Sequence, residues 1–309
     1  MNKEFYTKPL HVILLAIVAT FLWGCAPSVI KMGYALLALD SSMTSSILLF
    51  AGYRFTLAGI LVVIIQSMFQ KRLMTPEKGA LKYILILAMF QTFGQYFAYY
   101  LGLARTTGVN AAIITGLGAL FVLLLSVYVF RIEKMKNTKL IGCVIGFIGI
   151  LVMNITSFSN SNGHMTGDLL IVCSNMCYAI AACFMTLFSK KYQSVMLSGY
   201  QFILGGLGLV LVGKMFGGTI AFNSLFSYLD LFYLGMISAV AYTIWGLLLS
   251  HNPASQIGIY GCFTPIFGVL VSAIVLDEWQ QALSISSILA LIMIVLAVYI
   301  VNKGEYENN

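Results

Sequence analysis

The side chains best able to do chemistry in this sequence are amides and phenols within one apolar stretch. Gln91 and Gln95 are four residues apart, and Tyr96 follows directly. Residues three and four apart share one face of a helix, and a polar group inside a membrane costs free energy unless it faces protein, water or a solute. The spacing predicts a solute pathway along this face; hydrogen bonding between helices is the alternative. The polar residues of this stretch are Gln91, Thr92, Gln95, Tyr96, Tyr99 and Tyr100.

Large aromatic rings in other apolar stretches extend this set. Trp23 lies four residues before Pro27, which removes a backbone hydrogen bond from the helix and frees a carbonyl. Pro265 interrupts a later stretch in the same way, with Tyr260 before it. Such rings either line a binding cavity or fill the core of a helix bundle. The predicted substrate-binding residues are Trp23, Gln95, Tyr96, Tyr178, Tyr242, Trp245 and Tyr260.

Charged side chains are scarce inside the apolar stretches. All ten Asp and Glu residues lie at the ends of these stretches, in loops or in the termini, whereas ion-coupled carriers often use a buried carboxylate. The pattern favours facilitated diffusion, with coupling through His251 or a tyrosine network as the alternative. Arg54 could pair with a solute carboxylate, but we expect it to extend outward as a structural anchor. A phosphate-binding Gly-Lys-Ser/Thr loop is missing, so the sequence does not predict ATP as an energy source.

The composition requires hydrocarbon as the solvent for most of the chain. Of 309 residues, 60% are hydrophobic and 9% are charged, against about 25% charged in soluble domains. The net charge of +7 comes from short clusters between apolar stretches, as expected for loops at an anionic membrane surface and not for nucleic-acid binding. The six cysteines form no Cys-x-x-Cys pair, and neither a metal nor another cofactor is predicted.

Ten apolar segments are long enough to cross a bilayer, which takes roughly 20 residues. They cover residues 10–33, 45–67, 81–104, 108–130, 139–157, 167–189, 195–216, 227–250, 255–276 and 283–302. With the amino terminus inside, thirteen of the seventeen Lys and Arg residues fall on the cytoplasmic side. An even number of spans returns the carboxyl terminus to that side. We therefore expect a multi-pass protein of the cytoplasmic membrane with both termini in the cytoplasm.

The two halves of the chain, residues 10–157 and 167–302, resemble each other weakly at an offset of about 150 residues. Tyr96 lines up with Tyr242, and Glu133 lines up with Glu278. Each half holds five predicted spans, so the second half must enter the membrane from the opposite side. Inverted repeats of this kind are typical of carriers that alternate access to a site near the midplane.

Three short motifs carry a family resemblance: Tyr53-Arg54-Phe55, Leu103 to Thr107, and Thr264 to Phe267 with Leu276-Asp277-Glu278 after it. Together with the ten spans in two halves, they make the chain resemble the EamA-like members of the drug/metabolite transporter superfamily. The chain departs from the family pattern at residues 131–133, where relatives tend to have Gly before the Glu. The resemblance implies a cytoplasmic-membrane permease of the kind that exports amino acids or related metabolites.

The sequence therefore predicts an all-α integral membrane protein with ten transmembrane helices as two inverted five-helix repeats. Its predicted function is export of a small organic metabolite, such as an amino acid or derivative, by alternating access without ATP. A multidrug or cation exporter is the alternative. An intramembrane enzyme is a further one, although the sequence holds no Gly-x-Ser-x-Gly or His-Glu-x-x-His motif. The predicted partners are the solute and the lipid bilayer, and a monomer and a homodimer both stay open.

Overall fold

A computed structural model describes residues 3–132, 134–159, 164–252, 257, 260–261 and 263–306. Within these ranges the chain forms helices and connecting loops and no strand. Three features of the sequence prediction lie outside the described residues: Glu133, Cys262 and most of the first third of the predicted ninth span. The all-helical prediction is confirmed for the part of the chain that is described.

The helices follow the predicted segments closely. They are α1 (Lys3–Thr7), α2 (Pro9–Leu36), α3 (Thr44–Gln70), α4 (Leu81–Leu87), the π-helix η1 (Ala88–Gly94), α5 (Gln95–Leu103), α6 (Gly108–Thr115), α7 (Gly118–Tyr128), α8 (Asn137–Ser159), α9 (His164–Phe188), α10 (Ser194–Met215), α11 (Leu225–His251), α13 (Phe263–Val275), α14 (Trp279–Ala282) and α15 (Ile285–Tyr306). Among the described residues, seven helical stretches are long and apolar enough to cross a membrane. Three further apolar segments are shorter: Asn137–Gly149 within α8, Phe263–Val275 (α13) and Ile285–Ile300 within α15. The chain is a multi-pass membrane protein.

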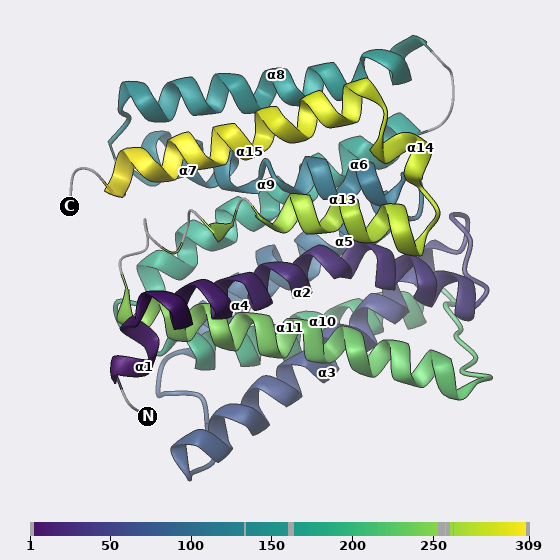
Figure 1. The fold of residues 1–309 in the computed structure, drawn as a ribbon. Helices are drawn as coiled ribbons and strands as arrows, with labels where there is room; N and C mark the ends of the chain where they lie inside the picture. Colours follow the sequence, from purple (N-terminus) through teal and green to yellow (C-terminus); the bar gives the residue numbers. More distant parts are fainter. Residues whose placement is uncertain are drawn as a thin grey trace.

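The helices form one bundle in which α2 and α9 hold central positions. Helix α2 packs against α11 and α13, whereas α9 packs against α5 and α7. Helices α3 and α10 form one flanking pair, and α8 and α15 form another; Figure 1 shows the second pair side by side along one edge of the bundle. Helix α1 and the last turns of α15 lie at the same end, and α14 lies at the opposite end (Figure 1).

Glycine brings α3 and α10 into backbone contact. A Cβ at Gly59 would lie 2.6 Å from the carbonyl oxygen of Gly199 and 2.7 Å from the backbone nitrogen of Ile203. Neither backbone atom can move without shifting the helix axis. Small residues at such crossings permit the van der Waals packing that holds membrane helices together, because lipid supplies no hydrophobic force between them.

We expect Gly59→Ala to lower the thermal midpoint of the detergent-solubilised protein. Overpacking of this kind typically costs about 1–3 kcal/mol, and the clash here is with backbone. Gly246→Ala is the matched control, since its Cβ would meet only a Val195 methyl at 3.7 Å, an ordinary contact. Equal midpoints for the two variants, measured by thermal unfolding, would contradict this account of the α3–α10 contact.

The third predicted span is not one continuous α-helix. Residues Ala88–Gly94 form the π-helix η1 between α4 and α5. A π-helix closes its hydrogen bonds over five residues instead of four, so it rotates the faces that follow it, and such segments are frequent at functional sites. The span at residues 108–130 is likewise divided, because α6 ends at Thr115 and α7 begins at Gly118. Sequence periodicity predicted neither interruption.

Candidate functional site

Aromatic rings from four helices meet in the interior of the bundle. The Tyr96 ring of α5 stacks on Phe55 of α3, with centroids 3.7 Å apart. The Trp23 ring of α2 lies 5.5 Å from Tyr242 and 5.1 Å from Trp245, both on α11. We call Trp23, Phe55, Tyr96, Tyr242 and Trp245 the aromatic cluster. Four of its five members were predicted from the sequence, and Phe55 was not.

A hydrogen-bond network crosses this cluster between the third and eighth predicted spans. The Gln91 amide donates to the Tyr242 hydroxyl at 3.2 Å, and the Tyr96 and Tyr242 hydroxyls lie close enough to interact electrostatically. The buried carbonyl oxygens of Gln91 and Gln95 have no hydrogen-bond partner in the described part of the protein. Buried polar atoms are nearly always paired, so these two acceptors are open to a solute or to water.

Pro27 adds a backbone acceptor at the same place. It lies inside α2 and is buried, and because proline has no N–H, the carbonyl of Trp23 lacks its donor four residues on. All seven predicted substrate-binding residues keep some accessible surface despite their position in the bundle. Large rings that are packed yet still accessible are suited to contact a small organic solute.

The single polar face predicted for residues 91–100 is wrong in detail. Thr92 donates to Gln201 of α10 at 2.5 Å, whereas the Tyr99 hydroxyl lies near Thr115 of α6. The π-helix explains the divergence, because it turns Thr92 away from the face that carries Tyr96. Thr92 therefore takes the alternative role, hydrogen bonding between helices.

Two predicted residues lie apart from the cluster. Tyr178 of α9 packs against Gly118 of α7, although its hydroxyl is near enough to Tyr242 for an electrostatic interaction. Tyr260 packs with Val12, Ala16 and Leu248 in a small apolar cluster that also touches Trp245. The structure therefore brings Trp23, Tyr96, Tyr242 and Trp245 together directly, and it puts Tyr178 and Tyr260 at the edge of that group.

Arg54 was predicted to extend outward as an anchor, and this is wrong. Its side chain is 3% exposed. It donates to the Leu234 carbonyl at 3.3 Å, to the Tyr100 hydroxyl at 2.9 Å and to Ser238 at 3.2 Å. The physical reason is that three acceptors on α5 and α11 meet the guanidinium inside the bundle, so it does not need to reach the membrane surface.

Two carboxylates are more buried than their positions near helix starts suggested. Asp168 near the start of α9 is 4% exposed and accepts hydrogen bonds from Thr106 and Asn110. Asp230 near the start of α11 is 9% exposed, and its Oδ2 atom has no hydrogen-bond partner among the described residues. The argument for facilitated diffusion put all carboxylates at the ends of apolar stretches, in loops or in the termini; these two do lie near helix starts, but they are buried.

Contacts between the two halves of the chain close the bundle at the end that carries α14. The Glu278 carboxylate accepts from the backbone N–H groups of Gly108 and Val109, at 3.0 and 2.9 Å, and lies 3.8 Å from the Lys31 ammonium. Gln281 donates to Asn110 at 2.6 Å. A carboxylate at the start of α6 is stabilised by the unpaired N–H groups there.

We expect Glu278→Gln to lower the thermal midpoint, because the neutral amide keeps the shape but loses the charge that faces Lys31 and the start of α6. A loss of about 0.5–2 kcal/mol is typical for a partly buried charge at a helix start. Asp277→Asn is the control, since Asp277 is exposed, has a φ of 55° and is replaced by a residue that tolerates this conformation. Equal midpoints for the two variants would exclude the proposed role of the Glu278 charge.

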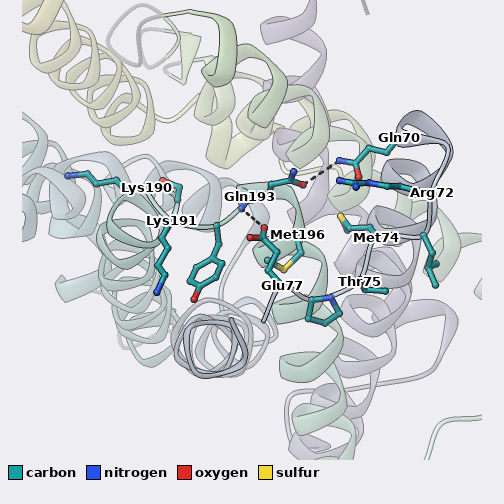
Figure 2. A pocket seen from close by; sticks show the side chains of 13 residues that line it. Gln70, Arg72, Met74, Thr75, Glu77, Lys190, Lys191, Gln193 and Met196 are labelled. Carbon is teal, nitrogen blue, oxygen red and sulfur yellow. Dashed lines mark hydrogen bonds between the residues drawn. The ribbon is translucent and has the colours of Figure 1, made fainter. Parts of the chain in front are cut away.

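A polar pocket of about 780 Å³ is lined by residues of the loop after α3, which lies at the end of the bundle away from α14 (Figure 1). It is formed by the loop after α3 and the loop between α9 and α10, and its cations are Arg72, Lys190 and Lys191. Figure 2 shows Gln193 bonded to both Gln70 and Glu77 across this pocket, at 3.4 and 3.2 Å. A hydrogen bond to Tyr192 raises the pKa of the Lys191 ammonium, so this cation stays charged. The predicted substrate-binding residues do not line the pocket.

Comparison with known protein families decides what kind of protein this is. The profile of the EamA-like transporter family matches residues 10–155 and again residues 165–303. The chain belongs to the EamA-like transporter family. An EamA-like chain is a membrane transporter, which agrees with the polar and aromatic groups that line its interior.

Relatives of this EamA-like transporter carry names of the same kind. An uncharacterized transporter of Archaeoglobus fulgidus is 26% identical over 94% of this chain and 97% of the relative. The uncharacterized transporter YyaM of Bacillus subtilis is 23% identical over 83% of this chain and 86% of the relative. One solved crystal structure has the same fold over 96% of this chain and 98% of its own, with a TM-score of 0.62 and 17% identity.

Proposed function

We propose that this transporter moves a small organic metabolite, such as an amino acid or a derivative, out of the cytoplasm by alternating access without ATP. The observation that carries the proposal is the pair of unpartnered amide oxygens on Gln91 and Gln95, beside the Tyr242 hydroxyl that accepts from Gln91 and the nearby hydroxyl of Tyr96. These acceptors lie inside apolar spans, where a buried polar atom without a hydrogen-bond partner costs several kcal/mol. A bound solute offers them donors. The proposed substrate-binding residues are Trp23, Gln95, Tyr96, Tyr178, Tyr242, Trp245 and Tyr260.

We also propose that ten helices cross the membrane, as two inverted repeats over residues 10–157 and 167–302. Helices α8 and α15 support this count, because they are 23 and 22 residues long. The common end of α1 and α15 supports an even number of crossings (Figure 1). It also supports termini on one side of the membrane, which the basic loops assign to the cytoplasm.

Packing and backbone geometry support the inverted repeat. In the first half, α2 packs against α11 and α13 of the second half. In the second half, α9 packs in the corresponding way against α5 and α7 of the first half. Residues with left-handed backbone also recur at one offset. Lys71 follows α3 and Gly217 follows α10, 146 residues later. Arg131 follows α7 and Asp277 follows α13, again 146 residues later. Such a pseudo-two-fold arrangement permits two alternative closures around one site.

The two ends of the bundle support alternating access. At the α14 end, Lys31, Asn110 and residues 106–109 of the first half bind Asp168, Glu278 and Gln281 of the second. At the α1 end, the two halves meet around the polar pocket of Figure 2. We assign the pocket as the cytoplasmic vestibule and the α14 end as the closed external gate. The Arg54 guanidinium, next to the aromatic cluster and with no carboxylate within 4.0 Å among the described residues, favours a solute that carries a carboxylate over a simple cation.

The proposal is tested by a thermal-shift screen of the purified protein against amino acids, nucleosides and cationic drugs, followed by counterflow of each hit in proteoliposomes. We expect at least one metabolite to raise the thermal midpoint and to show saturable counterflow. Counterflow of cationic drugs alone would favour the multidrug alternative, and a lack of counterflow for all three classes would contradict the transport function.

A further inference from the structure

We propose that Arg54 and Asp230 bind the carboxylate and the ammonium group of a zwitterionic solute, whose side chain lies in the aromatic cluster. This inference rests on the proposed transport function and identifies the chemical class of the solute. Neither residue belongs to the set predicted from the sequence as substrate-binding.

The Arg54 guanidinium has donors to spare. Its three hydrogen bonds use Nε, Nη1 and Nη2 once each, and a guanidinium carries five N–H donors in a planar fork that suits a carboxylate. In the described part of the chain, no carboxylate lies within 4.0 Å of it. A cation that is 97% buried therefore has neutral partners and no adjacent negative charge. Such a charge is costly unless a counter-charge comes close.

Asp230 is a buried anion that, like the buried cation Arg54, has no ion-pair partner within 4.0 Å among the described residues. Its side chain is buried against α2, and Oδ2 lies 2.6 Å from the position that a Cβ at Gly33 would take. The glycine thus makes room for the carboxylate. Oδ2 is nevertheless without a hydrogen-bond partner among the described residues. A buried carboxylate oxygen in this state is an acceptor open to an N–H donor, which the ammonium group of an amino acid supplies.

The two charges lie along one face of α11. Asp230, Leu234 and Ser238 follow at intervals of four, and the last two hold the Arg54 guanidinium. Arg54 interacts electrostatically with Asp230 without forming an ion pair within 4.0 Å in the described structure. The protein thus presents a cation and, a short distance away, an anion. An amino acid carries the complementary pair, a carboxylate and an ammonium group.

The charged pair adjoins the aromatic cluster. The Arg54 guanidinium carbon lies over the Phe55 ring at 4.8 Å, and the same ring stacks on Tyr96 at 3.7 Å. A solute held by its charged groups at Arg54 and Asp230 would therefore extend its side chain toward Tyr96 and Tyr242. In this arrangement the charged groups would bind the two ends of the solute backbone, and the neighbouring rings and hydroxyls would contact its side chain.

Charge balance selects a zwitterion over singly charged solutes. Arg54 and Asp230 together are neutral, and a zwitterion adds no net charge to the low-dielectric interior while it pairs with both. A plain carboxylate would pair with Arg54 and leave Asp230 facing a like charge. A plain amine would do the reverse. The site should therefore discriminate against both truncated forms.

The test uses matched probes that lack one charge, in counterflow with the full-length protein in proteoliposomes. For L-phenylalanine the probes are phenylalaninamide, which lacks the carboxylate, and 3-phenylpropionate, which lacks the ammonium group. Equivalent sets are made for leucine, serine and glutamine. We expect the wild-type protein to prefer at least one zwitterion over both of its truncated forms by about tenfold or more.

The variants assign each charge to its residue. We expect Arg54→Gln to lose the preference over the amide, and Asp230→Asn to lose the preference over the deaminated acid. Equal wild-type rates for a zwitterion and its truncated forms, or counterflow of nucleosides without any amino acid, would overturn this inference and leave the transport function standing. The wild-type comparison needs no variant, so the result does not depend on whether either substitution permits folding.

Discussion

Tyr96→Ala is expected to abolish solute counterflow while the protein still folds. The substitution removes the ring that stacks on Phe55 at 3.7 Å and the hydroxyl that meets Tyr242. Removing groups that contact the solute and hold its other contacts in place typically lowers the rate by about 100-fold or more, because positioning is lost with the contact. The measurement is counterflow in proteoliposomes, with protein content and size-exclusion profile matched to wild type.

Two further variants separate the effect of losing the Tyr96 ring from two other effects: the loss of its hydroxyl, and the loss of an aromatic side chain elsewhere in the bundle. Tyr96→Phe keeps the stacking and loses the hydroxyl near Tyr242, so we expect an intermediate rate. Tyr233→Ala removes the same side chain from a position on α11 that is 43% exposed, on the surface of the bundle, and we expect a rate near wild type. Wild-type counterflow by Tyr96→Ala would remove α5 from the solute pathway.

The sequence was informative wherever one periodic pattern decided the structure. Nine of the ten predicted apolar segments coincide with helices within four residues at each end, because a continuous apolar run between polar breaks has few alternative structures in lipid. The match of Tyr96 with Tyr242, inferred from a weak internal repeat, agrees with the electrostatic interaction between their hydroxyls. The first success comes from a local pattern of apolar residues, and the second from a pattern that the two halves of the chain repeat.

The parts that sequence reasoning missed depend on contacts between distant helices. Arg54 looked like an anchor because a lone cation in an apolar run usually reaches the membrane surface, and its acceptors Tyr100, Leu234 and Ser238 lie 46 to 184 residues away along the chain. Asp230 looked like a residue at a helix end, and only the packing of Gly33 against it reveals its burial. The π-helix left one sequence signal, Gly94, which is too common a residue in membrane helices to be decisive.

The electrostatic link between Arg54 and Asp230 predicts that their neutralising substitutions are not additive. Asp230→Asn leaves a buried guanidinium without a negative charge nearby, and Arg54→Gln leaves a buried carboxylate without a positive one. Each single variant is therefore expected to lose about 2 kcal/mol or more of folding stability, because a lone buried charge is penalised. The double variant contains neither charge and avoids that penalty.

We therefore expect the double variant to be more stable than the sum of the single losses predicts, by about 0.5–3 kcal/mol, the usual coupling between interacting residues. Thermal midpoints of the four proteins in one detergent measure the coupling, and counterflow measures the function. Recovery of stability without recovery of zwitterion counterflow is the expected combination, since the two charges are needed for the solute and not for the helix bundle. Additive losses in stability would mean that the gap between Arg54 and Asp230 is too wide for the two charges to act on each other, and a single solute could not then bridge them.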